Sequence, residues 1–328
     1  MLVVAGAAAL VLVLVAVVSV ARGDLALPVG DVFRALVGQG DAATRFVVVE
    51  LRLPRALTGA LVGLALGLAG AVTQTAVRNP LATPEMLGIT VGASAGAVAV
   101  IVLGGSNGVV GSGLASVGMP LAALAGGLVA AAAIYLLAWR GGIDGYRLVL
   151  VGIGIDAIGG AIVYWLLNVA DVNDAARALV WITGSLNARG WEHAAPLGFA
   201  LLLLAPVVLW LGRHLDVLSL GEETAVALGV RVGWLRGGLT LLAFALAAVA
   251  TSAAGPIMFV ALASPQIAQR LSGTPRPPLV GSALVAAALT VTADLLARSL
   301  IGAAELPVGV VTAVLGAPFL IYLLVRRR

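Results

Sequence analysis

Three arginines lie at the ends of long apolar stretches, where a guanidinium can meet another protein. Arg52 and Arg55 stand three positions apart across Pro54, just before one apolar run, and Arg298 lies near the end of another. A guanidinium in such a place can form two parallel hydrogen bonds with a carboxylate of a docked protein. Each arginine could instead extend to the membrane surface without a partner. Asp294, four residues before Arg298, could also hold that arginine within its own helix.

One acid lies far inside an apolar stretch. Asp156 is ten residues from Tyr146, about 15 Å along a helix, which places it near a membrane midplane. Gly152 and Gly160 leave room one turn to either side. The residue could carry a proton in an ion-coupled transporter, but no histidine or base inside the same stretch accompanies it. The pattern favours a polar lining of a wide pathway.

The residues for metal or covalent chemistry are sparse. The chain has no cysteine, and His193 and His214 flank opposite ends of one apolar run, so we expect no thiolate site and no metal centre. Ser185 and Ser264 have no nearby base in sequence, which argues against a nucleophile. We expect no catalytic residues and no cofactor bound by this chain.

The composition requires a membrane protein. Hydrophobic residues make up 61% of the 328 residues and charged residues only 10%, against about 25% charged residues in soluble domains. The length allows about ten spans and no separate soluble domain, so we expect one transmembrane domain over 1–328. The net charge of +4 comes from arginines scattered at span ends. Lipid, and not nucleic acid, explains them.

We expect an all-α polytopic protein with about ten transmembrane helices. The apolar runs predict spans at 2–21, 56–77, 85–103, 115–138, 147–169, 193–212, 236–254, 257–271, 279–300 and 307–325. The span at 257–271 is the shortest, and Pro256 and Pro265 predict that it is broken or partly outside the membrane. Residues 1–21 lack a basic start and a cleavage site, so we expect a retained first helix.

Ten spans place both termini on one side. With the termini in the cytoplasm, eleven arginines lie inside and eight outside. This bias favours a multi-pass protein of the inner (cytoplasmic) membrane with both termini cytoplasmic.

A proline-rich break separates the second and third spans. Pro80 and Pro84 remove backbone donors and turn the chain, and Thr83 is expected to cap the helix that follows. Small residues from Gly88 to Ala97 would let a neighbouring helix approach closely.

Several separated motifs share one resemblance. RLPR at 52–55, Q-x-x-x-RNPLATPEMLG at 74–88, LGEETAVALGV at 220–230, GPIMFVALASPQIAQRL at 255–271 and ELPVGVVTAVLGAPFLIYLL at 305–324 resemble the iron-siderophore and cobalamin class of ABC importer permeases, the FecCD type. The motifs follow the same order and cover nearly the whole chain.

The resemblance implies a fold, partners and a cargo. It implies a type II ABC importer permease that pairs with a second permease copy or a paralogue, two ATPase subunits that hold ATP and Mg²⁺, and an extracytoplasmic substrate-binding protein. The implied cargo is a ferric siderophore, with cobalamin and haem as alternatives. The chain itself would not be an enzyme.

The resemblance also implies residue roles. Arg52, Arg55 and Arg298 would contact acidic residues on the two lobes of the binding protein. The coupling segment, a short helix between glycines that would fit a groove on the ATPase, comprises Leu220, Gly221, Glu222, Glu223, Ala225, Leu228 and Gly229. The cytoplasmic gate comprises Asn79, Leu81, Gly145 and Tyr146. By spacing alone, the coupling segment could be a plain amphipathic surface helix.

Two departures loosen the assignment of cargo. Many relatives carry Pro-His where this chain has Pro265-Gln266, and the loop GTPRPP that follows lacks their usual acidic-basic turn. A separate departure concerns the gate, because the turn GGIDGYR lacks the small hydroxyl residues of some relatives. An ion-coupled transporter that uses Asp156 and a non-transporting membrane scaffold are the alternatives in other functional classes.

Overall fold

The computed structural model describes residues 2–23, 27–104, 112–219, 221–300 and 305–325. Every regular element in these ranges is helical. In chain order they are α1 (Leu2–Ala21), α2 (Val29–Leu36), α3 (Ala42–Phe46), the π-helix η1 (Val47–Arg52), α4 (Leu53–Val77), α5 (Ile89–Gly104), α6 (Ser112–Ala138), α7 (Gly145–Val169), α8 (Val172–Ile182), α9 (Trp191–Gly212), α10 (Leu215–Ser219), α11 (Glu222–Ala227), α12 (Val232–Ala254), α13 (Val260–Ser272), α14 (Leu279–Ser299) and α15 (Val308–Val325).

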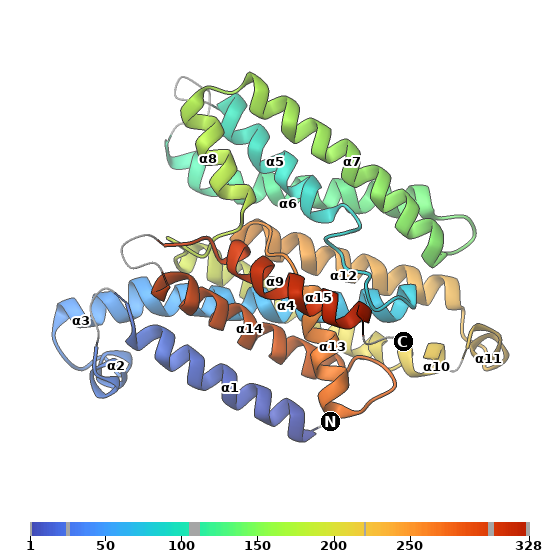
Figure 1. Cartoon of the computed structure of the whole chain (residues 1–328), viewed down its shortest axis with the longest axis horizontal. Coiled ribbons are helices and arrows are strands. Elements are labelled where there is room, and N and C mark those ends of the chain that lie inside the picture. The colour runs from blue at the N-terminus through green and yellow to red at the C-terminus, as the bar shows by residue number, and fades with distance from the viewer. Residues whose placement is uncertain (1, 24–26, 105–111, 220, 301–304, 326–328) are drawn as a thin grey trace.

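The ten expected spans all appear as helices. Seven helices are long and apolar enough to cross a membrane, and α5 and α15 are shorter apolar helices. The expected eighth span is the shortest of the ten, with 13 residues in α13. The start of α1 and the end of α15 lie at the same end of the molecule as α10 and α11 (Figure 1), as an even number of spans requires.

The second span begins earlier than expected. One continuous helix of 36 residues runs from Ala42 to Val77, because no residue before Pro54 breaks it. The π-helix η1 lies just before this proline, where the N–H of Leu53 donates to the carbonyl of Val48, five residues back. Pro54 has no N–H to donate, so a wider turn in front of it is tolerated.

The third span begins later than expected, which corrects the predicted cap. Thr83 Oγ1 accepts a hydrogen bond from the N–H of Met86 at 3.3 Å, but it caps only a single turn. Gly88 has a φ of +87°, a left-handed conformation that ends the turn. The regular helix α5 therefore begins at Ile89.

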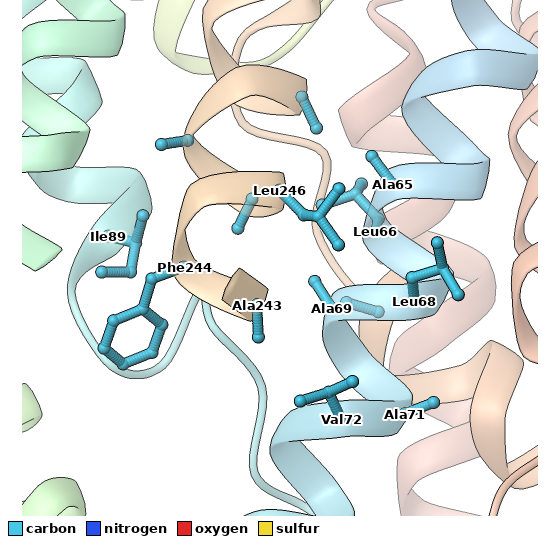
Figure 2. Close-up of a cluster of buried hydrophobic side chains, with 14 of the residues drawn as sticks. Ala65, Leu66, Leu68, Ala69, Ala71, Val72, Ile89, Ala243, Phe244 and Leu246 are labelled. Carbon is cyan, nitrogen blue, oxygen red and sulfur yellow. The ribbon is translucent and has the colours of Figure 1, made fainter. Parts of the chain in front are cut away.

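Helix α4 forms the centre of the molecule. In its most apolar stretch, the helix Ala42–Val77 has 78% of its residues buried, against 11% in α1. Leu66 and Leu68 of α4 lie in one cluster with Phe244 of α12 and Ile89 of α5 (Figure 2). Because lipid is as apolar as these side chains, close van der Waals packing and not water exclusion holds such helices together.

Glycines permit the closest helix contacts. A Cβ added at Gly96 of α5 would lie 2.1 Å from the carbonyl oxygen of Ala122 in α6, and one at Gly70 of α4 would lie 2.0 Å from the carbonyl oxygen of Ala261 in α13. The prediction that small residues between Gly88 and Ala97 allow close approach is confirmed.

The break before α13 is also confirmed. Residues 255–259 are not helical, and Gly255 and Phe259 both have a positive φ. Pro265 has no N–H, which frees the carbonyl of Ala261. Gln74 Nε2 lies 3.5 Å from that carbonyl oxygen and donates to the carbonyl of Leu262 at 3.1 Å. A side chain of α4 thus satisfies the freed backbone, as buried polar groups require.

Candidate functional site

The predicted site residues fall at two ends of the helix bundle and at one point between them. The arginine end contains Arg52, Arg55 and Arg298. The coupling end contains α10, α11 and the turn between α6 and α7 (Figure 1).

At the arginine end, Asp294 lies between two of the three arginines. Its Oδ1 accepts hydrogen bonds from Nε and Nη2 of Arg55 at 3.2 and 2.9 Å, and its Oδ2 lies 3.2 Å from Nε of Arg298. The Asp294 side chain is 1% exposed. The expected pair within α14 is confirmed, and two guanidiniums compensate the desolvation of one buried carboxylate.

Glu305 provides a second carboxylate for Arg55. Nη1 of Arg55 donates to its two oxygens at 3.2 and 3.0 Å, and the Glu305 side chain is 38% exposed. Sequence reasoning missed this residue because 250 positions separate it from Arg55 and it lies in no periodic pattern. Arg55 therefore has one buried and one accessible acidic partner.

Arg52 and Arg298 both contact the end of α1. Nη1 of Arg52 donates to the carbonyls of Val20 and Ala21 at 3.0 and 3.2 Å. Nη2 of Arg298 donates to Oγ of Ser19 at 2.7 Å and to its carbonyl at 3.3 Å. The last carbonyls of a helix have no partner within the helix and carry partial negative charge, so the two arginines stabilise this end of α1. Contact of these arginines with a docked protein stays a prediction.

At the coupling end, α11 is the short helix that the sequence predicts. Gly221 precedes it with a φ of +111° and Gly229 follows it with a φ of +81°. The N–H of Val230 donates to the carbonyl of Ala225 at 3.0 Å, which closes the C-terminal turn in the manner of a glycine cap. The two glycines thus define a helix of 6 residues.

The side chains of α11 divide between the core and the surface. Ala225 is fully buried, whereas Leu228 is 63% exposed, and Glu223 is exposed. Val226, which sequence reasoning missed, is 60% exposed. Val226 and the C-cap residue Leu228 are thus two apolar side chains that the rest of the chain leaves uncovered. Glu222 opens the helix, and Leu220 lies outside the described residues.

An ion pair connects α10 to the turn before α14. Arg276 Nε donates to Oδ1 of Asp216. This hydrogen bond, together with the positive charge of Arg276, holds the pKa of Asp216 below its usual value. The carboxylate therefore stays ionised and fixes α10 beside the bundle.

The two predicted gate turns lie against each other. Gly145 begins α7, and a Cβ there would lie 3.1 Å from the carbonyl oxygen of Val77, the last residue of α4. Two residues on, Asn79 Oδ1 accepts a hydrogen bond from the N–H of Leu81 at 3.0 Å and holds the turn. Tyr146 is 76% exposed. A role for these four residues in gating stays a prediction.

Asp156 lies between the two ends, on the surface of α7. Its side chain is exposed, as is that of Ile153 one turn before it. Among the described residues, none forms a hydrogen bond or an ion pair with its carboxylate. Leu87 fills the space beside Gly152, while nothing lies within 4 Å of a Cβ at Gly160. The acid faces away from the chain, so the proton-relay hypothesis gains no partner residue.

The histidines lie apart. Nδ1 of His193 is 3.1 Å from Oε1 of Glu192, and Nε2 is 2.9 Å from Nη1 of Arg189. Burial lowers the pKa of Arg189, while the charge of Glu192 opposes that shift. His214 lies beyond the other end of α9. In the part of the chain that the structure describes, no group of three or more His, Cys, Asp or Glu side chains could hold a metal ion.

Comparisons with known proteins agree with this architecture. The model of the FecCD transport family matches residues 10–326. The ferric enterobactin transport system permease protein of Escherichia coli (strain K12) is 40% identical over 304 residues, which cover 93% of this chain and 90% of the relative. The achromobactin transport system permease protein of Dickeya dadantii (strain 3937) is 40% identical over 325 residues, which cover 98% and 90%.

Two further matches are a permease named for another cargo and a solved structure. A vitamin B12 import system permease protein of Serratia proteamaculans (strain 568) is 37% identical over 293 residues, covering 88% of this chain and 84% of the relative. A solved structure of a transporter assigned to the metal-chelate ABC type, in an inward-facing conformation, superposes with a TM-score of 0.86 at 29% identity and covers 99% of this chain and 100% of that chain. The type II permease fold is thereby confirmed, and the chain belongs to the FecCD transport family.

Proposed function

We infer that this chain is the membrane permease subunit of an ATP-driven importer of ferric chelates. Two permease chains, as copies or as paralogues, would form the pathway. Two ATPase subunits would bind the coupling end and hold ATP and Mg²⁺, and a binding protein would deliver cargo at the arginine end. The chain would lie in the inner membrane with both termini in the cytoplasm.

The observation that carries this proposal is the arrangement of α11. Val226 of α11 and the C-cap residue Leu228 are exposed at a helix that is too short to span a membrane. Gly142 of the turn between α6 and α7 packs against Gly233 at the start of α12. A partner that moves α11 together with the start of α12 would therefore also push on the turn that leads into the predicted gate residues Gly145 and Tyr146 at the start of α7.

Two cargo classes have support among the relatives. The relatives at 40% identity are named for enterobactin and achromobactin transport, which favours a ferric siderophore for this chain. A relative at 37% identity is named for vitamin B12 import. Cobalamin is therefore the second candidate.

ATP turnover by the assembled transporter tests the proposal. We expect this chain to copurify with its ATPase subunit and to make ATP turnover depend on cargo and binding protein. Leu228→Asp places a charge in the apolar contact and should reduce copurification and turnover at least tenfold, since burial of an unpaired charge is costly. Val37→Asp is the matched control, because Val37 is 70% exposed at the arginine end. Equal copurification of both variants would contradict the proposal.

A further inference from the structure

A cavity of about 870 Å³ opens at the arginine end. It lies between the end of α5, α8, the loop at 185–189 and the segment before α15. Apolar side chains supply much of its wall, including Val100 and Ile101 of α5, Met119 of α6 and Trp181 of α8. Its volume is within the range of small-molecule sites, about 300–1,000 Å³.

Two guanidiniums line the same cavity. Arg177 of α8 is 67% exposed, and its Nη2 lies 3.5 Å from Oδ1 of Asp174, so this pairing leaves most of the side chain accessible. Arg189 is held by its neighbours, since its Nε donates to the carbonyl of Ser185 at 3.3 Å and its Nη1 lies 2.9 Å from His193. One guanidinium is therefore accessible and the other is fixed in place.

The lining of the cavity holds more basic than acidic side chains. Of its lining residues, Glu305 is the one acid, set against Arg177 and Arg189. Both oxygens of Glu305 accept hydrogen bonds from Arg55, which compensates its negative charge from the other side. Asp174 lies beside Arg177, and the charge of Glu192 acts on Arg189, so the two guanidiniums offer an anion hydrogen-bond donors, and not a large net charge, next to an aromatic and aliphatic wall.

Glu305 shows that the cavity lies next to Arg55. The same carboxylate contacts Arg55 and lines the cavity. A cargo released by a protein docked over Arg55 would therefore find the cavity directly beside it. This step rests on the proposed function.

We propose that this cavity is a receiving site for anionic ferric chelates. Arg177 and Arg189 would donate hydrogen bonds to carboxylate or catecholate oxygens of the chelate, which are strong acceptors for guanidinium groups. Trp181 and Met119 would contact its organic frame. A neutral cobalamin would gain little from the guanidiniums, so the site would favour chelates over cobalamin.

Direct binding tests the site separately from transport. The purified permease in nanodiscs is titrated with ⁵⁵Fe-labelled ferric citrate and, in parallel, with cyanocobalamin. We expect Arg177→Gln to weaken ferric citrate binding about tenfold, the effect of losing one charge-assisted contact, and Arg177→Lys to restore most of it. Cyanocobalamin binding should change less than twofold in either variant.

Arg34→Gln is the matched control. Arg34 also lies on a helix at the arginine end, is 70% exposed and stands 3.5 Å from an acid three residues before it, as Arg177 does. Unchanged ferric citrate binding in Arg177→Gln, or an equal loss in Arg34→Gln, would overturn the proposed site. Uptake by the full transporter tests the proposed function separately. If the wild-type permease binds ferric citrate through Arg177 but the assembled transporter does not import it, the proposed function is wrong and the proposed binding site is still supported.

Discussion

At the scale of single residues, Asp294 connects three parts of the arginine end. Its carboxylate contacts Arg55 of α4 and Arg298 of its own helix, and Arg298 in turn holds Ser19 at the end of α1. Loss of this one carboxylate would remove the ion pair with Arg298 in a site where both side chains are nearly buried. Removing one member of a buried ion pair typically costs about 3–5 kcal/mol.

We therefore expect Asp294→Ala to lower the free energy of unfolding by about 3 kcal/mol. Arg55 keeps Glu305 as a partner, which places the cost at the lower end of that range. Near-ultraviolet circular dichroism during denaturation in detergent measures the change. Asp171→Asn is the control, because Asp171 is the N-cap residue of α8 and its side chain forms no capping hydrogen bond. A loss for Asp294→Ala no larger than for the control would show that the network does not hold α1 in place.

The contacts of the arginine end were predictable only in part. The spacing of four residues between Asp294 and Arg298 predicts their pair, because such residues are neighbours on a helix. No local signal connects Arg55 with Glu305 across 250 positions. The same applies to the contacts of Arg52 with α1, since they depend on how three helices meet. Sequence alone therefore identified the arginines and the acid that pairs with Arg298, but not the contacts of Arg52 and Arg55.

At the scale of helices, glycines determine how closely α4 meets its neighbours. Cβ atoms at Gly63 and Gly67 would lie 2.4 Å from backbone atoms of α14, and one at Gly70 would lie 2.0 Å from backbone of α13. Backbone cannot rotate away as a side chain can, so each of these contacts requires a glycine.

We expect Gly70→Ala to destabilise the protein by about 1–3 kcal/mol, because the added methyl group must push α4 and α13 apart. Gly238→Ala on α12 is the matched control, since nothing lies within 4 Å of a Cβ there. That substitution should be neutral or stabilise the helix by up to about 1 kcal/mol. Thermal unfolding midpoints of the two variants in the same detergent compare them. Equal midpoints would contradict the close packing.

The helices themselves were more predictable than their ends. Long apolar runs sufficed for most of the expected spans because the thickness of the membrane sets their length, whereas α13 has only 13 residues. The start of α5 was wrong, since Gly88 and the turn before it override the cap at Thr83. The short helices α2 and α8 were not predicted, because they are partly polar and contain no apolar run long enough to cross a membrane. Tertiary contacts decide such segments.

At the scale of the whole molecule, the two ends differ in what they offer a partner. The coupling end presents exposed apolar side chains at α11 and exposed Tyr146 at the start of α7. The arginine end presents Glu305 and the accessible guanidinium of Arg177 beside a cavity. An ATP-driven importer requires two different ends, because the ATPase subunits bind at one end and the binding protein at the other. A membrane scaffold would not need a cavity beside the surface that binds its partner.

Uptake into sealed proteoliposomes tests the central claim most directly. The vesicles contain this permease with its ATPase subunit, the binding protein and a ⁵⁵Fe-labelled ferric chelate are added outside, and ATP is enclosed or omitted. We predict uptake that requires enclosed ATP, the ATPase subunit and the binding protein, and that does not change when a proton gradient is imposed or collapsed. Uptake driven by the proton gradient without the ATPase subunit would contradict the account and would favour an ion-coupled transporter that uses Asp156.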